Sequence, residues 1–205
     1  MAKGNLFVVT APSGAGKTSL VSALVKSQSD ICVSVSHTTR APRPGEVNGI
    51  NYHFVTNEAF IQMLGQGEFL ESAQVYGYHY GTSQTWVNQQ LDSNTNVILE
   101  IDWQGAAQIR NLNPDACFIF ILPPSLASLR ARLENRGQDD TDTIEARMRQ
   151  AVSDIGHVAE ADYIVVNEEF EAALEDIKAI IRSSQLKVTA QQYQRSDLLS
   201  SLGKG

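Results

Sequence analysis

The sequence predicts an α/β fold: a parallel sheet flanked by helices, with a small mixed α/β insertion and a polar helical hairpin. Three observations predict it. Short, nearly continuous apolar runs alternate with stretches of helical periodicity, which is typical of buried parallel strands joined by helical crossovers. Residues 33–83 break this alternation with β-hairpin character rich in Tyr, Thr and Gly. Residues 129–149 are polar and arginine-rich, which suits an exposed helical hairpin.

The regular elements follow in chain order. Runs rich in β-branched and aromatic residues predict strands at 6–10, 97–102, 117–122 and 163–167. Helical periodicity predicts helices at 17–28, 104–111, 124–135, 142–160 and 169–184, with a short one inside the insertion at 57–65. The last twenty or so residues are expected to form a surface helix with a frayed end.

Composition excludes several classes of protein. The 205 residues carry 23 acidic against 16 basic side chains, a net charge of −7, which argues against a nucleic-acid binder with a broad basic face. Cys32 and Cys117 lie far apart without clustered histidines, so neither a zinc site nor a disulfide framework is expected. No apolar run has the length of a membrane span, and the N-terminal run is too short for a signal peptide. We therefore expect a cytoplasmic protein without nucleic-acid or membrane partners.

The first candidate site is the loop "APSGAGKT" between strand 6–10 and helix 17–28. It follows the phosphate-loop pattern G-x-x-x-x-G-K-[ST], except that Ala11 replaces the first glycine. Backbone N–H groups of such a loop wrap around phosphate oxygens, and the helix N-terminus adds a favourable dipole. Lys17 would lie along the transferred group and the Thr18 hydroxyl would bind Mg²⁺. A generic glycine-rich turn is the alternative, which the strand before and the helix after disfavour. The predicted nucleoside triphosphate site comprises Ala11, Pro12, Ser13, Gly14, Ala15, Gly16, Lys17 and Thr18.

The segment "SHTTRAPRPGE" carries Arg40 and Arg43, and Pro42 and Pro44 stiffen it. Two guanidinium groups on a rigid loop suit a phosphate dianion. A solvated basic turn is the alternative, but a neighbouring phosphate loop favours phosphate binding.

Glu71, Tyr80 and Thr82 form a third candidate group in the insertion. A carboxylate matches the N1–H and N2–H₂ donors of guanine, an edge that adenine does not present. The spacing by itself is uninformative.

Glu100 and Asp102 end the predicted strand 97–102, at the edge of a parallel sheet where ligands bind. They would hold Mg²⁺ or its waters, or else cap the helix that follows. Arginines in the polar hairpin would close over a triphosphate, although some of them would only form ion pairs with neighbouring glutamates. These arginines are Arg130, Arg132, Arg136, Arg147 and Arg149.

Taken together, these motifs resemble those of guanylate kinases, above all the bacterial single-domain enzymes. The most specific match is "SHTTRAPRPGEVNGINYHF" to the family signature S-x-T-T-R-x-P-R-x-G-E…Y-x-F. The segments "YGTS", "IDWQG", "FILPPS" and "RLENRG" also match in order and approximate spacing. The resemblance extends from the phosphate loop to about residue 184. One departure besides Ala11 is Glu100, which stands where the family usually has Asp.

The resemblance implies that MgATP phosphorylates GMP, and also dGMP, giving ADP and GDP (or dGDP) in purine metabolism and GMP recycling. It implies a kinase domain at 1–188, with a core at about 1–32, 84–125 and 158–188. The insertion 33–83 would bind GMP, 126–157 would be a lid, and 189–205 would be a helical tail.

The resemblance also implies roles for single residues. Guanine would be recognised by Ser36, Glu71, Thr82 and Asp102, and the GMP phosphate by Arg40, Arg43, Tyr52 and Tyr80. Catalysis would depend on Lys17, Arg136 and Arg147. Asn167 would lie near the ATP base, and Glu100 would bind Mg²⁺ through water.

Two alternatives stay open. A phosphate-loop kinase with another monophosphate acceptor shares the ATP loop but should lack the paired carboxylates. A guanylate-kinase-like module that binds peptides would be catalytically silent, which the intact Gly14, Gly16, Lys17 and Thr18 disfavour. The sequence also leaves open whether copies of the chain form a homo-oligomer.

Overall fold

The structure is a computed structural model that describes residues 3–135 and 140–203. Its core is a parallel five-stranded sheet with the order β2-β7-β1-β8-β9. The strands are β1 (Leu6–Thr10), β2 (Ile31–Val33), β7 (Asn96–Glu100), β8 (Cys117–Leu122) and β9 (Tyr163–Val166). The four predicted strands are present. The apolar runs of β1, β7 and β8 are buried at the centre of the sheet, as expected for parallel strands. The fourth, β9, lies at the edge of the sheet, and only Val165 of its residues is buried.

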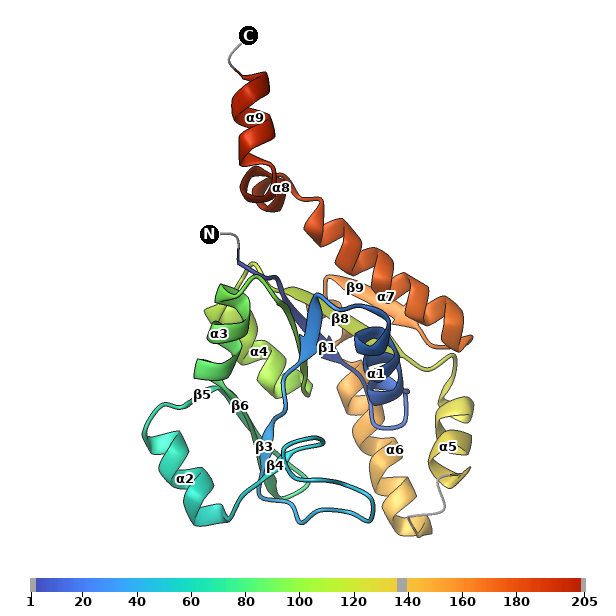
Figure 1. The fold of residues 1–205 in the computed structure, drawn as a ribbon. Coiled ribbons are helices and arrows are strands. Elements are labelled where there is room, and N and C mark those ends of the chain that lie inside the picture. The colour runs from blue at the N-terminus through green and yellow to red at the C-terminus, as the bar shows by residue number, and fades with distance from the viewer. Residues whose placement is uncertain (1–2, 136–139, 204–205) are drawn as a thin grey trace.

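Helices cover both faces of this sheet (Figure 1). On one face α1 (Lys17–Ser27) and α7 (Phe170–Gln185) pack on strand residues such as Phe7 and Ile119. On the other face α3 (Gln84–Asp92) and α4 (Trp103–Leu112) pack on strand residues such as Val8 and Leu99. Alternate strand residues therefore belong to different hydrophobic clusters, which is the consequence of the two-residue period of a strand.

The insertion forms a second, mixed sheet with the order β4-β3-β6-β5. Its strands are β3 (His37–Thr38), β4 (His53–Phe54), β5 (Phe69–Val75) and β6 (Tyr78–Ser83). The helix α2 (Asn57–Gly65) closes it, with the ring of Phe60 stacked at 4.5 Å on that of Phe69. A parallel sheet with a small mixed insertion confirms the predicted fold class.

The polar hairpin consists of α5 (Leu126–Asn135) and α6 (Thr141–Ile155). A separate apolar cluster of Leu129, Leu133, Ile144, Met148 and Ala151 joins them. The salt bridge from Arg130 Nη1 to Glu145 Oε1 at 2.6 Å lies across the two helices.

Several predicted bounds were wrong. The helix predicted at 142–160 ends at Ile155, and a separate 3₁₀ turn (Val158–Glu160) follows it. The strand predicted to reach residue 102 ends at Glu100. The C-terminal segment forms two short helices, α8 (Val188–Gln194) and α9 (Ser196–Leu202), that extend away from the body of the molecule (Figure 1). Neither β2 nor α3 was predicted. Among the described residues, no helix has the length and apolarity needed to cross a membrane.

Candidate active site

The phosphate-loop segment connects β1 to α1 and takes a conformation that requires glycine. Gly14 and Gly16 have φ angles of 93° and 97°, in the left-handed region that side chains disfavour. A Cβ at position 16 would also lie 2.3 Å from the amide nitrogen of Asn167. Ala11 is not among the residues with positive φ, which for non-glycine residues of the described chain are Tyr76 and Asn94. Alanine at the first position of the loop therefore imposes no backbone strain.

Two polar side chains at the start of α1 contact the end of β7. The Lys17 ammonium group donates a hydrogen bond of 2.9 Å to the carbonyl oxygen of Ile101. The Thr18 hydroxyl donates to the carboxylate of Glu100. The phosphate loop and the acidic strand end thus form one surface, as the position of both at the carboxyl edge of a parallel sheet predicts.

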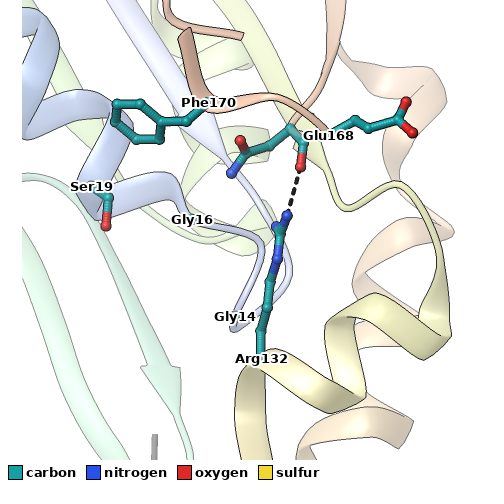
Figure 2. A pocket seen from close by; sticks show the side chains of 7 residues that line it. Gly14, Gly16, Ser19, Arg132, Glu168 and Phe170 are labelled. Carbon is teal, nitrogen blue, oxygen red and sulfur yellow. Dashed lines mark hydrogen bonds between the residues drawn. The ribbon is translucent and has the colours of Figure 1, made fainter. Parts of the chain in front are cut away.

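A cavity of about 300 Å³ adjoins the phosphate loop (Figure 2). Arg132 of α5 reaches across it and donates to the carbonyl oxygen of Asn167 at 2.8 Å. The Asn167 side chain in turn donates to the carbonyl oxygen of Ala15 at 2.7 Å. The cavity is lined by Gly14, Gly16, Ser19, Arg132, Asn167, Glu168 and Phe170. Asn167, which is predicted to lie near the ATP base, is among the lining residues, whereas Ser19, Glu168 and Phe170 were not singled out.

The carboxylate of Glu71 lies in the interior, between the insertion and α4. It accepts a hydrogen bond of 2.6 Å from the Thr82 hydroxyl. Burial, with the Asp102 carboxylate adding to it, raises the pKa of Glu71 to about 7. Gly105 provides the space for this group, because a Cβ at position 105 would lie 2.5 Å from Glu71 Oε2.

Asp102 caps α4. Its carboxylate accepts from the backbone N–H of Gly105 at 3.0 Å and from the Gln104 side chain at 3.0 Å. The capping role that was the alternative for the acidic strand end is therefore correct for Asp102. Ser36 is buried in the loop before β3.

Arg40 is paired within its own loop, a feature that the sequence prediction missed. Its Nη2 donates to both carboxylate oxygens of Glu46, at 2.8 and 2.9 Å. The same carboxylate accepts from the backbone N–H of Arg43 at 2.7 Å, so Glu46 holds the loop with both arginines in place. Glu46 is the glutamate of the family signature quoted above, but the spacing of residues in that signature does not predict that it pairs with Arg40.

Two tyrosines stand beside Arg40. The rings of Tyr52 and Tyr80 meet edge to face at 5.9 Å, and the Arg40 guanidinium lies 5.4 Å from the centre of the Tyr52 ring. Burial, with the negative charge of Glu100 adding to it, raises the pKa of Tyr52 to about 12, so that its hydroxyl keeps its proton at neutral pH.

The arginines of the helical hairpin separate into different roles. Arg130 is paired with Glu145, as the ion-pair alternative predicts. Arg132 contacts the phosphate-loop segment, and Arg147 lies on α6. Arg136, a predicted catalytic residue, lies outside the described residues.

The first strand of the parallel sheet leads through a loop with two glycines into a helix. This arrangement defines the phosphate-loop class of nucleotide-binding proteins. Comparison with known proteins assigns the family. The sequence model of the guanylate kinase family matches residues 3–184. The chain therefore belongs to the guanylate kinase family.

Individual relatives agree with this assignment over most of their length. The guanylate kinase of Pseudomonas fluorescens strain Pf0-1 is 56% identical over 199 residues, which is 97% of each chain. That of Methylobacillus flagellatus is 54% identical over 200 residues, covering 98% of this chain and 99% of the relative. The crystal structure of guanylate kinase from Anaplasma phagocytophilum superposes with a TM-score of 0.78 at 34% identity, covering 91% of this chain and 89% of that one.

Proposed function

We propose that the protein transfers the γ-phosphoryl group of ATP to the phosphate of GMP, with the residues named below in their respective roles. Membership of the guanylate kinase family makes the chain an ATP:GMP phosphotransferase. The observation that supports the division of roles is the hydrogen bond from Lys17 to the Ile101 carbonyl oxygen. This bond joins the ATP loop to the segment 100–102. Glu100, on one side of Ile101, accepts from Thr18. Asp102, on the other side, lies near Glu71.

ATP binds at the phosphate loop in this proposal. Residues 11–18 hold the triphosphate, and the cavity that Arg132 and Asn167 help to line accepts the rest of the nucleotide. The contacts of Arg132 and Asn167 with the Ala15 carbonyl support this placement, since they fix the cavity wall to the loop.

GMP binds in the insertion. Ser36, Glu71, Thr82 and Asp102 recognise guanine, and Arg40, Arg43, Tyr52 and Tyr80 bind its phosphate. The buried carboxylate of Glu71 supports this assignment, because guanine offers two N–H donors to a carboxylate and adenine does not. The proposed contacts are with the guanine base and the phosphate and do not involve the ribose 2′-hydroxyl, so dGMP is also an acceptor.

The GMP phosphate must compete with Glu46 for Arg40. The Glu46 carboxylate accepts only from Nη2 of Arg40, whereas a phosphate dianion can accept from two guanidinium nitrogens at once and brings more charge. We infer that Glu46 keeps the arginines preorganised in the free protein and shares them when GMP binds.

The residues around Thr18 suit Mg²⁺. Mg²⁺ takes oxygen ligands, often one or two from protein side chains with the rest from water and phosphate, and the Thr18 hydroxyl and Glu100 carboxylate are such ligands in direct contact. When bound, the ion neutralises charge on the β- and γ-phosphates. The longer Glu100 side chain reaches Thr18, which supports its role in place of the usual aspartate.

The chain's own contribution is positioning. The acceptor phosphate is already anionic, so no general base is needed. Lys17 and the lid arginines Arg136 and Arg147 neutralise the charge that spreads over the transferred group.

An ATP-consumption assay over a panel of nucleoside monophosphates tests the proposal. We expect turnover with GMP and dGMP and none with AMP, CMP or UMP. Turnover with AMP but not GMP would indicate a phosphate-loop kinase with a different monophosphate acceptor. No turnover with any nucleoside monophosphate would favour a peptide-binding module.

A further inference from the structure

The strand β5 has a bulge immediately before Glu71. Its register with β6 shifts between Phe69 and Glu71, so Leu70 is an extra residue in the strand. Neighbouring side chains of a regular strand point to opposite faces, but those of Leu70 and Glu71 are both buried. Leu70 packs in the same apolar cluster as Ile109 of α4. Because the bulge interrupts the regular pairing of the strand, contacts outside the sheet must help to fix Glu71.

The side chain of Gln108, on α4, makes such a contact with the next residue of the strand. Its Oε1 accepts from the backbone N–H of Ser72 at 3.1 Å, and its Nε2 donates to the Ser72 carbonyl oxygen at 2.7 Å. In the part of the chain that the structure describes, β5 is the last strand in the order of the second sheet. The Gln108 amide therefore bonds the free edge of β5 through the same two backbone groups that a neighbouring strand would use.

The helix α4 holds this edge at a second point and leaves room for the carboxylate. Gln104, one helical turn before Gln108, donates to the Gln74 carbonyl oxygen of the same strand at 3.5 Å. Gly105 lies on the same stretch of helix, and its missing side chain provides the space for Oε2 of Glu71. The position of β5 on α4 therefore decides where this carboxylate lies.

Recognition of guanine through a carboxylate is sensitive to small displacements. The N1–H and N2–H₂ donors require both oxygens of one carboxylate at a fixed place, and a hydrogen bond weakens steeply when it is misaligned. Oε1 of Glu71 is held by the Thr82 hydroxyl, on the paired strand β6. A shift of the β5–β6 hairpin along α4 would move both oxygens together.

We propose that Gln108 is a positioning residue for guanine recognition, which holds Ser72 so that the carboxylate of Glu71 meets both guanine donors. The inference rests on the proposed function, because it takes the role of Glu71 from there. Gln108 does not itself contact the nucleotide, so its effect on the acceptor passes through Glu71. The inference extends the guanine-recognition site from the insertion to a helix of the core.

Steady-state kinetics of Gln108→Met with GMP and inosine monophosphate (IMP) test the inference. The variant keeps the length of the side chain and loses both hydrogen bonds. IMP lacks the N2 amino group and so gains less from a well-placed carboxylate. We expect the preference for GMP, measured as the ratio of the two kcat/KM values, to fall about five- to tenfold. The KM for ATP and the kcat with GMP should stay within about twofold.

This ratio distinguishes positioning from a loss of stability. A smaller folded fraction lowers kcat/KM for both acceptors by the same factor and leaves the ratio unchanged. Gln89→Met is the matched control, because Gln89 is an exposed glutamine of the neighbouring helix α3, and it should leave the ratio unchanged.

Glu71→Gln separates this inference from the proposed function. In that background Gln108→Met should change the ratio by less than about twofold, because its effect passes through Glu71. A preserved preference for GMP in Glu71→Gln would refute the proposed role of Glu71 and this inference with it. A preserved preference in Gln108→Met, or an equal fall in both backgrounds, would refute the inference alone.

Discussion

In the proposed site, the ionisation of Glu71 links GMP binding to pH. Its pKa of about 7 lies above the ordinary 4.5, so the free protein holds a proton there in mildly acidic solution. Guanine offers only donors at this edge and therefore needs the ionised carboxylate. GMP binding must release that proton, and affinity should rise as the pH increases through 7.

Calorimetric titration with GMP at pH 6, in buffers of different ionisation enthalpy, measures this release. We expect about one more proton to be released from the unchanged protein than from Glu71→Gln. The Gln variant should also have a higher KM for GMP, with little change in that for ATP, because its amide places a donor opposite guanine's donors. Equal proton release from the two proteins would remove Glu71 from the base-recognition site.

In the proposed function, Lys17 acts on the transferred group and not on the acceptor. Lys17→Ala should lower kcat by about 10²–10³-fold, because a preorganised positive charge is lost at the transferring phosphate. GMP affinity, measured by calorimetry, should stay within a few-fold, since the proposed guanine and phosphate contacts come from other residues, which apart from Asp102 lie in the insertion. Lys26→Ala, an exposed substitution in the same helix, is the control and should change neither quantity. A parallel loss of GMP affinity would contradict the separation of the two sites.

The helix α5 packs against the phosphate loop through its buried leucines. A Cβ at Gly14 would lie 3.0 Å from methyl groups of Leu129 and Leu133, so these side chains pack directly on the loop. Leu133→Ala should cost about 2–4 kcal/mol of unfolding free energy and raise the KM for ATP several-fold, because it leaves a cavity in a fully buried cluster.

Leu126→Ala, on the same helix, is the matched control. Leu126 is 47% exposed, so the same substitution should cost less than about 0.5 kcal/mol. Denaturant unfolding and ATP kinetics measure both variants. Equal costs for the two, or a KM change for GMP in place of ATP, would show that α5 does not support the loop.

The elements that the sequence predicted are those with a strong local pattern. Strand 6–10 and strand 117–122 are continuous apolar runs, and their bounds are correct. The strand β2 has only three residues, and α3 buries only Val87, so neither carries enough periodicity to be recognised. The break after Ile155 follows from Gly156, which the predicted helix ignored.

The candidate site was predictable to the extent that it follows motifs. The phosphate loop and the acidic end of β7 meet as their positions in a parallel sheet require. The contact of Arg132 with Asn167 joins residues 35 positions apart, and that of Asn167 with Ala15 joins residues 152 apart. No local pattern encodes such contacts, because they depend on how α5 packs beside the loop.

At the scale of the whole molecule, the C-terminal helices contribute little to the folded body. The side chains of Leu198, Leu199 and Leu202 are about half exposed or more, and the Gln191 amide bonds back to the Gln185 carbonyl at 2.9 Å. A chain that ends at Lys187 should therefore keep its kcat and a Tm within about 2 °C. Ile181→Ala, in the buried face of α7, is the contrasting variant and should lower the Tm by several degrees. Scanning calorimetry compares them, and a large loss on truncation would show that the tail packs on the body.

The missing side chain at Gly105 constrains the order in which acceptor choice can change during evolution. The glycine belongs to the helix that closes the core, yet the space above it belongs to an oxygen of Glu71. A larger residue at 105 would force the Glu71 carboxylate to move, because its Cβ would lie 2.5 Å from Oε2. In the proposed site, replacing Glu71 removes this clash, so we expect a change of acceptor base to be reached more readily when position 71 changes before position 105.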